Sequence, residues 1–373
     1  MRKSLNVIYQ YILKPFFFLF DPELVHDLIT FVGKTIAVIP GGQKLTRRFL
    51  RYENPILEQT IHGIHFTNPV GLSAGFDKDC NLPTILPDVG FGFMQVGSVT
   101  LKPYTGNPKP RLFRLKKSLG IVVYYGLKNI GVDRIIERFK NMKIDNQFPI
   151  SMSVAKTNSK DTCDTQQGIE DYTECLEKLV INDVGDFYTI NISCPNTFGG
   201  EPFTTPVRLT KLLKSISAVK TDKPIFVKMP INMPWLDFKK LIEVCIKYRM
   251  TGVIIGNLNK DHKSSTIKDS IPEHIKGGIS GKPTEALSND LIAKTYLEYG
   301  SRLTIIGVGG IFSAQDAYEK IKRGASLVQL ITGMIFMGPQ LIGDINRGLS
   351  KLLVADGYTN ISQAVGSYYH SSK

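Results

Sequence analysis

The stretch DFYTINISCPNTFGG (186–200) is a short apolar run that ends abruptly in polar residues, a proline and two glycines. A nearly continuous apolar run of this length is typical of a parallel β-strand that is buried on both faces. Asn191, Cys194 and Asn196 follow one another closely at its end. The stretch therefore indicates a buried strand whose end carries chemically useful side chains.

Seven further runs of this kind occur, and amphipathic helix patterns lie between most of them. Ser313 and Asp316, for example, form an expected N-cap and acidic first turn of one helix. Eight strands with intervening helices predict an α/β protein, a (β/α)₈ TIM barrel that forms one domain. A doubly wound open sheet is the alternative, but it usually has fewer strands. The expected strands are residues 69–75, 92–100, 149–156, 186–194, 224–229, 252–257, 304–310 and 327–333.

The amino-acid composition limits the kinds of site and partner that we expect. The five cysteines among 373 residues show neither a CxxC nor a metal-ligand spacing, which points to a reducing compartment and to no metal site. The net charge of +13 suits nucleic acid, an anionic membrane surface or an anionic small substrate. No nucleic-acid-binding motif is present, so we expect no nucleic-acid partner.

The first 45 residues differ from the rest. The run FFFLF (16–20) lies between Pro15 and Pro22, which predict a break between two short helices, the second with an acidic start. Neither apolar half reaches the ~20 residues that span a bilayer. A helix that lies in a membrane interface is one interpretation, which we favour, and an apolar cap docked on the barrel is the other. We therefore divide the chain into a helical extension (1–45) and a barrel domain (46–373).

Glycine-rich segments follow the last strands: GVGGI (307–311) and ITGMIFMGP (331–339), with GGISG (277–281) before them. Backbone N–H groups in such segments can hold a phosphate, and the loops after strands seven and eight are the usual phosphate position in this fold. No GxGxxG follows the first strand, which favours a mononucleotide cofactor over a dinucleotide.

The strand ends of a barrel share one face, where the active site lies. We therefore expect Cys194 to lie in the site, and Lys228, at the end of IFVKM, to place a positive charge near the cofactor ring. A structural, ion-paired lysine is the alternative for Lys228. The residues expected to converge are Lys78, Ser98, Lys156, Cys194, Lys228, Asn257, Gly309 and Gly333.

Several segments together resemble the dihydroorotate dehydrogenase family, FMN-dependent barrel enzymes of pyrimidine synthesis. The resemblance runs from about residue 10 to 350, and FFFLFDPELVHDLI (16–29) is similar to the membrane-associated, quinone-using branch (class 2), whose helical extension guides quinone to the flavin. It implies oxidation of dihydroorotate to orotate by an enzyme peripheral to the cytoplasmic side of the cell membrane, or to the inner mitochondrial membrane. The matching segments are GLSAGFDKD, VGSVTLKPYTGNPKPRLFRL, INISCPNT, VKM, GGISGKP, IIGVGGI and GASLVQLITGMIFMGP.

The resemblance also implies residue roles. Cys194 is the expected base, which takes the C5 proton of dihydroorotate while a hydride leaves C6 for the flavin. Asparagine supplies both a donor and an acceptor, as a pyrimidine edge requires. The expected substrate ligands are Lys78, Asn191, Asn196 and Asn257, and the expected FMN ligands are Ala74, Gly75, Ser98, Asn191, Lys228, Gly281, Gly309, Gly310, Thr332 and Gly333.

The sequence departs from the family pattern at four places. Cys194 stands where class 2 has serine, and a cysteine base is typical of the soluble class 1. Val123 and Ser153 replace asparagines, and Leu258 follows Asn257 where the family has a threonine. These departures leave alternatives open: another dihydropyrimidine or an unsaturated carbonyl compound as substrate, fumarate or NAD as acceptor, or a non-catalytic barrel that keeps a phosphate-ligand site.

Overall fold

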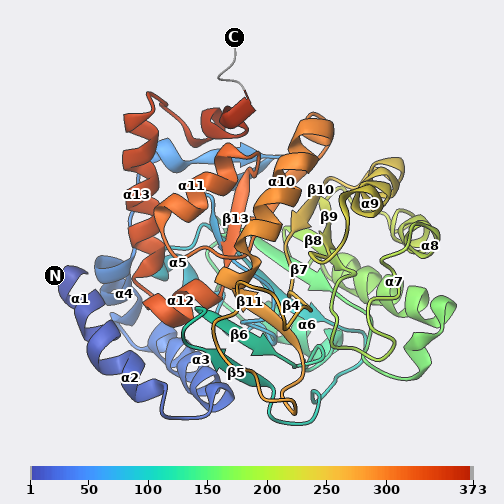
Figure 1. Cartoon of the computed structure of the whole chain (residues 1–373), viewed down its shortest axis with the longest axis horizontal. Coiled ribbons are helices and arrows are strands. Elements are labelled where there is room, and N and C mark those ends of the chain that lie inside the picture. The colour runs from blue at the N-terminus through green and yellow to red at the C-terminus, as the bar shows by residue number, and fades with distance from the viewer. Residues whose placement is uncertain (1, 370–373) are drawn as a thin grey trace.

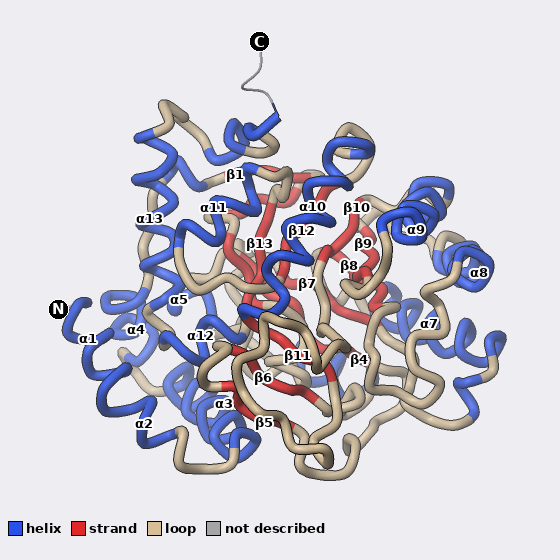
Figure 2. The backbone as a smooth tube through the Cα atoms, in the orientation of Figure 1, coloured by secondary structure: helices blue, strands red, loops and turns tan. Residues whose placement is uncertain are grey.

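Eight parallel strands form a closed barrel in a computed structural model that describes residues 2–369. All eight expected strands are present, and the (β/α)₈ prediction is confirmed. Figure 2 shows the strands gathered in the centre and the helices around them. The order around the barrel is β3 (Val70–Leu72), β4 (Phe93–Val99), β7 (Ile150–Val154), β8 (Phe187–Asn191), β9 (Ile225–Met229), β10 (Gly252–Ile255), β12 (Thr304–Val308) and β13 (Leu327–Leu330).

The helices pack their apolar faces on the outside of the barrel (Figure 1). Helices form at the amphipathic patterns between the strands, as expected, and Ser313 caps one of them by accepting a hydrogen bond from the Asp316 N–H. The helices that follow the extension are α5 (Leu86–Val89), α6 (Val132–Lys140), α7 (Thr165–Ile181), α8 (Pro206–Ile216), α9 (Trp235–Lys247), α10 (Glu285–Tyr299), α11 (Ala314–Lys322), α12 (Thr332–Met337) and α13 (Leu341–Ala355).

The amino-terminal end of the barrel is closed by packed aromatic rings. Phe93 and Phe187 lie at the starts of their strands and contact Phe66 of a short hairpin, with ring centroids 5.4 and 6.3 Å from Phe66. The hairpin consists of β1 (Gln59–Ile61) and β2 (Ile64–Phe66). Because this end is filled, a ligand can enter only at the carboxyl ends of the strands.

A second, antiparallel sheet was not expected from the sequence. It contains β5 (Leu112–Leu115), β6 (Gly120–Val123) and β11 (Gly278–Gly281), which come from two distant parts of the chain. Each strand has four residues, too few for a clear periodicity. Figure 1 shows the sheet beside α12, below the barrel in this view.

The N-terminal extension is helical, as expected, but Pro15 does not interrupt it. The first helical stretch continues from α1 (Arg2–Ile8) through a π-helical turn (Tyr9–Leu13) into α2 (Lys14–Phe17), with Pro15 in the first turn of α2. A wide turn accommodates a proline that cannot donate a backbone hydrogen bond. The break falls at Pro22, where Asp21 caps the next helix by accepting from Glu23 N–H and Leu24 N–H.

Two further helices complete the extension, α3 (Pro22–Val38) and α4 (Gly42–Leu50), so the helical part ends five residues beyond the expected position 45. No single helix in residues 2–369 has the length and apolar character to cross a membrane; α3 and α4, bent by 114°, pass that test only as a pair.

The extension is docked on the barrel through buried polar contacts. The Tyr9 hydroxyl donates to Ile335 O at 2.7 Å. Glu23, only 3% exposed, accepts from Arg111 and Lys128 at 3.0 Å each. A carboxylate this buried is stable only when cations surround it. The cap interpretation is therefore correct for one face of the extension, while its other face stays exposed.

We expect Glu23→Ala to lower the free energy of unfolding by about 3 kcal/mol, because it leaves two partly buried cations, Arg111 and Lys128, without this partner. Urea unfolding measures the change, and hydrogen exchange should show faster exchange in α3. Glu53→Ala is the matched control, since the Glu53 carboxylate is 64% exposed. Equal losses in the two variants would show that Glu23 does not hold the extension in place.

Candidate active site

Two adjoining cavities open at the carboxyl ends of the strands. The smaller one encloses about 530 Å³ and lies over β12, β13 and β11. The larger one encloses about 930 Å³ and extends from Lys228 and Cys194 to His26 of α3. Both are lined by Ala74, Lys228, Asn257, Leu258, Ser280, Ile331 and Thr332, so they form one continuous site.

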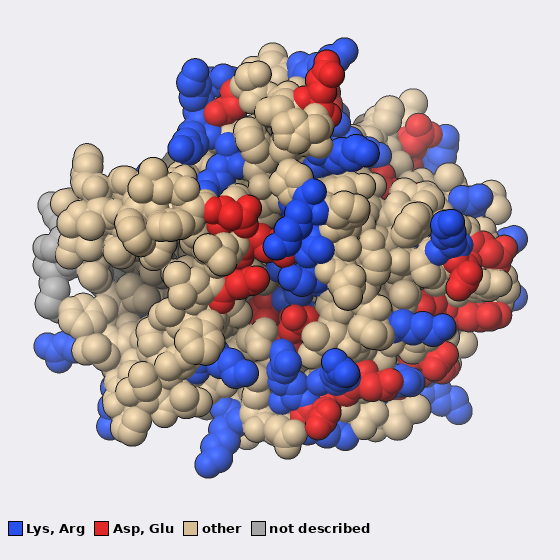
Figure 3. Space-filling model, turned by 90° about the horizontal axis from the view of Figure 1, so that it is seen from below, with Lys and Arg blue, Asp and Glu red and all other residues tan. Residues whose placement is uncertain are grey.

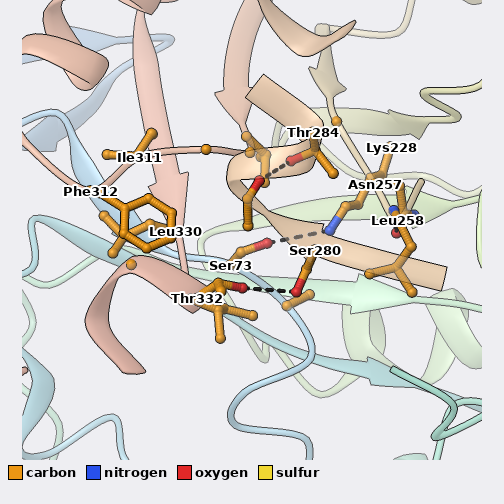
Figure 4. A pocket seen from close by; sticks show the side chains of 18 residues that line it. Ser73, Lys228, Asn257, Leu258, Ser280, Thr284, Ile311, Phe312, Leu330 and Thr332 are labelled. Atoms are coloured by element: carbon orange, nitrogen blue, oxygen red, sulfur yellow. Dashed lines mark hydrogen bonds between the residues drawn. The ribbon is translucent and has the colours of Figure 1, made fainter. Parts of the chain in front are cut away.

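The smaller cavity has a wall of backbone. Gly309 and Gly310 have φ angles of +108° and +76°, and a Cβ at either position would lie within 2.6 Å of Thr284 Oγ1 or 2.3 Å of Glu285 Cβ. Only glycine fits these positions. Figure 4 shows the Ser280 and Thr332 hydroxyls hydrogen-bonded at 2.9 Å at the edge of this wall. Gly281 and Gly333 complete the lining.

Lys228 extends from β9 into the junction of the two cavities. It is 5% exposed, and its ammonium donates to the Ser73 hydroxyl at 3.3 Å (Figure 4). It forms no ion pair with a carboxylate in residues 2–369. Burial lowers its pKa to about 8, and the Cys194 thiol opposes that shift. The alternative of an ion-paired structural lysine is therefore wrong, and the buried charge faces the space where a ligand would bind.

Three asparagine side chains surround this junction, and each is held by a neighbour. Asn191 donates to the Ser98 hydroxyl at 2.8 Å. Asn257 donates to the Ser193 hydroxyl at 2.6 Å. Asn196 donates to Val123 O at 2.8 Å, so the backbone at position 123 fixes this amide although its side chain is apolar. The amides are thus oriented before any ligand binds.

Cys194 lies just beyond β8 and lines the larger cavity. The pKa of its thiol is raised to about 11, mainly by burial; Glu201 also acts to raise it, while a backbone hydrogen bond from Asn196 and the charges of Lys228 and Lys156 act to lower it. At neutral pH the group is therefore a thiol flanked by two cations. For the thiol to ionise near neutral pH, a proton acceptor must take its proton or additional positive charge must lower its pKa.

The far end of the larger cavity contains Lys78, Tyr125 and His26. The Lys78 ammonium lies 4.0 Å from the centre of the Tyr125 ring, and burial lowers its pKa to about 8. His26 contacts Phe76 O at 2.9 Å, and burial together with the Lys78 charge lowers its pKa to about 4. His26 is therefore neutral at neutral pH, and α3 supplies part of the cavity wall.

The structure brings all the predicted site residues except Lys156 into the lining of these cavities. Lys156 is buried behind Cys194, under the loop that follows it. Ser153, at a position where an asparagine was expected, bonds to the Ser98 hydroxyl at 2.9 Å instead. Sequence reasoning did not identify Ser73, His26, Asn107 and Asn158, because their roles depend on partners 20 or more residues away.

Comparisons with known proteins agree on one family. The sequence profile named dihydroorotate dehydrogenase matches residues 56–353. The dihydroorotate dehydrogenase (quinone) of Sulfurovum sp. is 36% identical over 359 residues, which cover 95% of this chain and 97% of that protein. The dihydroorotate dehydrogenase (quinone) of Nostoc punctiforme is 34% identical over 380 residues, which cover 98% of this chain and 100% of that protein.

Solved structures agree with the sequence comparison. The Eimeria tenella enzyme in complex with ferulenol superposes with a TM-score of 0.82 at 27% identity, over 94% of this chain and 96% of that chain. The ligand-free form of the same enzyme superposes with a TM-score of 0.81, over 94% of this chain and 99% of that chain. Most of this chain therefore has a counterpart in known structures, and this chain belongs to the dihydroorotate dehydrogenase family.

Proposed function

We propose that this protein oxidises dihydroorotate to orotate in pyrimidine synthesis, with FMN as its cofactor and a quinone as the final electron acceptor. The observation that carries the proposal is a single continuous site in which a thiol, three oriented amides and two buried lysines face one cavity. The same cavity reaches the N-terminal extension at His26. Membership of the family supports both the substrate and the acceptor.

The smaller cavity fits the phosphate end of FMN. Its wall consists of backbone at Gly309, Gly310 and Gly333, where N–H groups can approach an anion closely. Lys228 supplies a buried positive charge without a carboxylate partner, which suits an electron-rich ring. When bound, FMN supplies the hydride acceptor. The residues proposed to hold it are Ala74, Gly75, Ser98, Asn191, Lys228, Gly281, Gly309, Gly310, Thr332 and Gly333.

The larger cavity provides the groups that the substrate requires. Dihydroorotate has a planar amide edge and a carboxylate, which asparagines and a lysine can bind. We assign the edge to Asn191, Asn196 and Asn257 and the carboxylate to Lys78. Cys194 then removes the C5 proton, and FMN, when bound, would accept the hydride from C6. The two neighbouring lysines favour the thiolate that this step needs.

A second candidate substrate class is favoured by a specific observation. Val123 and Leu258 both line the larger cavity with apolar side chains, where the family pattern has polar ones. A buried polar group of dihydroorotate left without a partner there would weaken its binding by about 1–3 kcal/mol. Another dihydropyrimidine or an unsaturated carbonyl compound with an apolar edge would avoid this loss.

Dihydroorotate should bleach the flavin absorbance of the purified protein within minutes when oxygen is excluded. A stopped-flow spectrophotometer measures the rate, and quinone, fumarate and NAD are then compared as reoxidants. Dihydrouracil and an unsaturated ester serve as alternative substrates. If neither bleaching nor orotate appears with dihydroorotate while another compound reduces the flavin, the second candidate class replaces the first.

Cys194→Ala should lower the rate of flavin reduction about 10²- to 10⁴-fold, the usual contribution of a general base. In the parent protein the rate should rise with pH toward the thiol pKa of about 11, because the thiolate is the reactive form. Cys194→Ser should retain partial activity. Cys163→Ala is the control, since Cys163 is exposed and lines neither cavity. Unchanged flavin reduction in Cys194→Ala would remove the base assignment.

The exposed face of the extension supports a peripheral membrane location, on the cytoplasmic side of the cell membrane or on the inner mitochondrial membrane. Tyr11, Leu19 and Phe31 are 77%, 80% and 66% exposed. Within the run FFFLF, Phe16 is exposed, but Phe18 turns inward and packs on Phe336, with ring centroids 5.4 Å apart. Figure 3 shows few charges on the left of this view, where α1, α2 and α3 lie in Figure 1.

The double variant Leu19→Asp with Phe31→Asp should bind phospholipid vesicles roughly 100-fold more weakly, because about 3 kcal/mol of apolar burial is lost. Turnover with a long-chain quinone should fall in parallel, and flavin reduction by substrate should not change. Ile181→Asp with Val354→Asp, exposed residues outside the extension, is the control pair. Vesicle sedimentation gives the affinity; equal binding by both double variants would refute the proposed face.

A further inference from the structure

The loop that follows Cys194, residues 197–205, is tightly folded. Gly199 and Gly200 have φ angles of +74° and +65°, and the Thr197 hydroxyl donates to Gly200 O at 2.7 Å. Phe203 anchors the far end of the loop: it is 1% exposed, and its ring centroid lies 5.5 Å from that of Tyr172. The position of this loop decides what surrounds the Cys194 side chain.

Two buried side chains hold both backbone polar groups of Phe198 in this loop. The Phe198 N–H donates to Asn158 Oδ1 at 2.7 Å, and the Lys156 ammonium donates to Phe198 O at 3.1 Å. Lys156 and Asn158 are 2% and 3% exposed, and both follow β7. A loop held by one hydrogen bond can pivot, whereas two bonds on opposite sides of one residue fix its orientation.

The charge of Lys156 is not compensated by an ion pair. No carboxylate of residues 2–369 lies within 4.0 Å of its ammonium, whose other contact is the Thr162 hydroxyl at 3.4 Å. Asp171, the nearest acid on α7, accepts from Thr157 N–H at 2.7 Å instead. Burial lowers the pKa of Lys156, while the Cys163, Asp171 and Cys194 groups raise it. A buried ammonium in this state gains from any negative charge formed nearby.

Each element around Cys194 contributes to its electrostatic environment. Lys228 on β9 and Lys156 after β7 favour the thiolate, and Glu201 of the loop disfavours it. Tyr172 on α7, whose hydroxyl donates to Asn191 O, is neutral because burial raises its pKa far above the physiological range. Lys260 forms an ion pair with Glu201 at 2.6 Å, which reduces the effect of that carboxylate. Lys156 is therefore one of two cations that can promote ionisation.

We propose that Lys156 and Asn158 are positioning residues: together they clamp the loop after Cys194 through Phe198, and the Lys156 ammonium promotes the thiolate form of Cys194. The inference rests on the proposed function, in which Cys194 is the base. Lys156 lines neither cavity, so it acts through Cys194 and the loop and not through contact with substrate.

Asn158 is also connected by hydrogen bonds to Asn196, one of the asparagines that we assign to the substrate. Asn158 donates to Gly126 O at 2.9 Å and to Asn107 Oδ1 at 3.4 Å. Asn107 in turn donates to Asn196 O at 2.9 Å. The segment around residue 158 therefore holds the chain after Cys194 at two points, Asn196 and Phe198.

The test is the rate of alkylation of Cys194 by iodoacetamide from about pH 7 to 10, below the thiol pKa of about 11, in a Cys163→Ser background, with the modified residue identified by mass spectrometry. Lys156→Met and Lys156→Gln should both slow alkylation about tenfold at every pH in this range, because loss of the charge raises the thiol pKa by about one unit. Lys156→Arg should restore the parent rate, and Lys239→Met is the control, because Lys239 is a partly exposed lysine that lines neither cavity.

Asn158→Ala should give the opposite result from the lysine variants: the alkylation rate should rise at every pH because the loop opens. An unchanged rate in both Lys156→Met and Lys156→Gln would overturn the electrostatic role, and an unchanged rate in Asn158→Ala would overturn the clamp. Lys156→Gln keeps a donor for Phe198 O, so it remains informative if Lys156→Met does not fold. Alkylation needs no turnover, so failure of the proposed reaction is measured separately.

Discussion

The closure of eight parallel strands into one barrel is the constraint on which the site depends. Closure forces all eight carboxyl ends onto one face, and the aromatic layer of Phe66, Phe93 and Phe187 fills the opposite end. The register of the paired strands then determines which residues lie side by side. Asn191 on β8, for example, lies beside Lys228 on β9. Residues that are far apart in the chain meet there because the sheet leaves them no other arrangement.

Burial is what gives the site its chemistry. The same low-dielectric surroundings raise the pKa of Cys194 and lower those of Lys228 and Lys78, so that a neutral thiol faces cations that have lost much of their hydration. The asparagines avoid a similar penalty because each is bonded to a serine hydroxyl or a backbone carbonyl. The ammonium of Lys228 is thus left without an ion-pair partner in residues 2–369 at a place where a ligand would compensate its charge.

The N-terminal extension has two faces with different roles. Its inner face is attached by Glu23 and by the Tyr9 hydroxyl, and it brings His26 into the wall of the larger cavity. Its outer face presents apolar side chains, including Leu19 and Phe31. A bound extension with an apolar exterior connects a cavity inside the barrel to the surface that we assign to the membrane, and this explains why one chain needs both parts.

The eight strands and their common face could be predicted from the sequence, because apolar runs and interspersed helix patterns are local properties. The glycines at 309 and 310, and the placement of Lys228 and Cys194 at strand ends, followed from the same local patterns. Other features needed the tertiary structure. The sheet of β5, β6 and β11 joins segments more than 150 residues apart, and Pro15 continues a helix that its sequence seemed to break.

The electrostatic state of the site was decided by distance and burial alone. Nothing in the sequence pairs Glu23 with Arg111 and Lys128, or directs Lys156 to Phe198 O, because these contacts join segments 42 to 105 residues apart. The order of residues therefore determined which groups reach the mouth of the barrel. Only the folded chain determined which of those groups are charged, which are bonded to one another, and which remain free to act on a ligand, since each depends on the solvent excluded by neighbours from elsewhere in the chain.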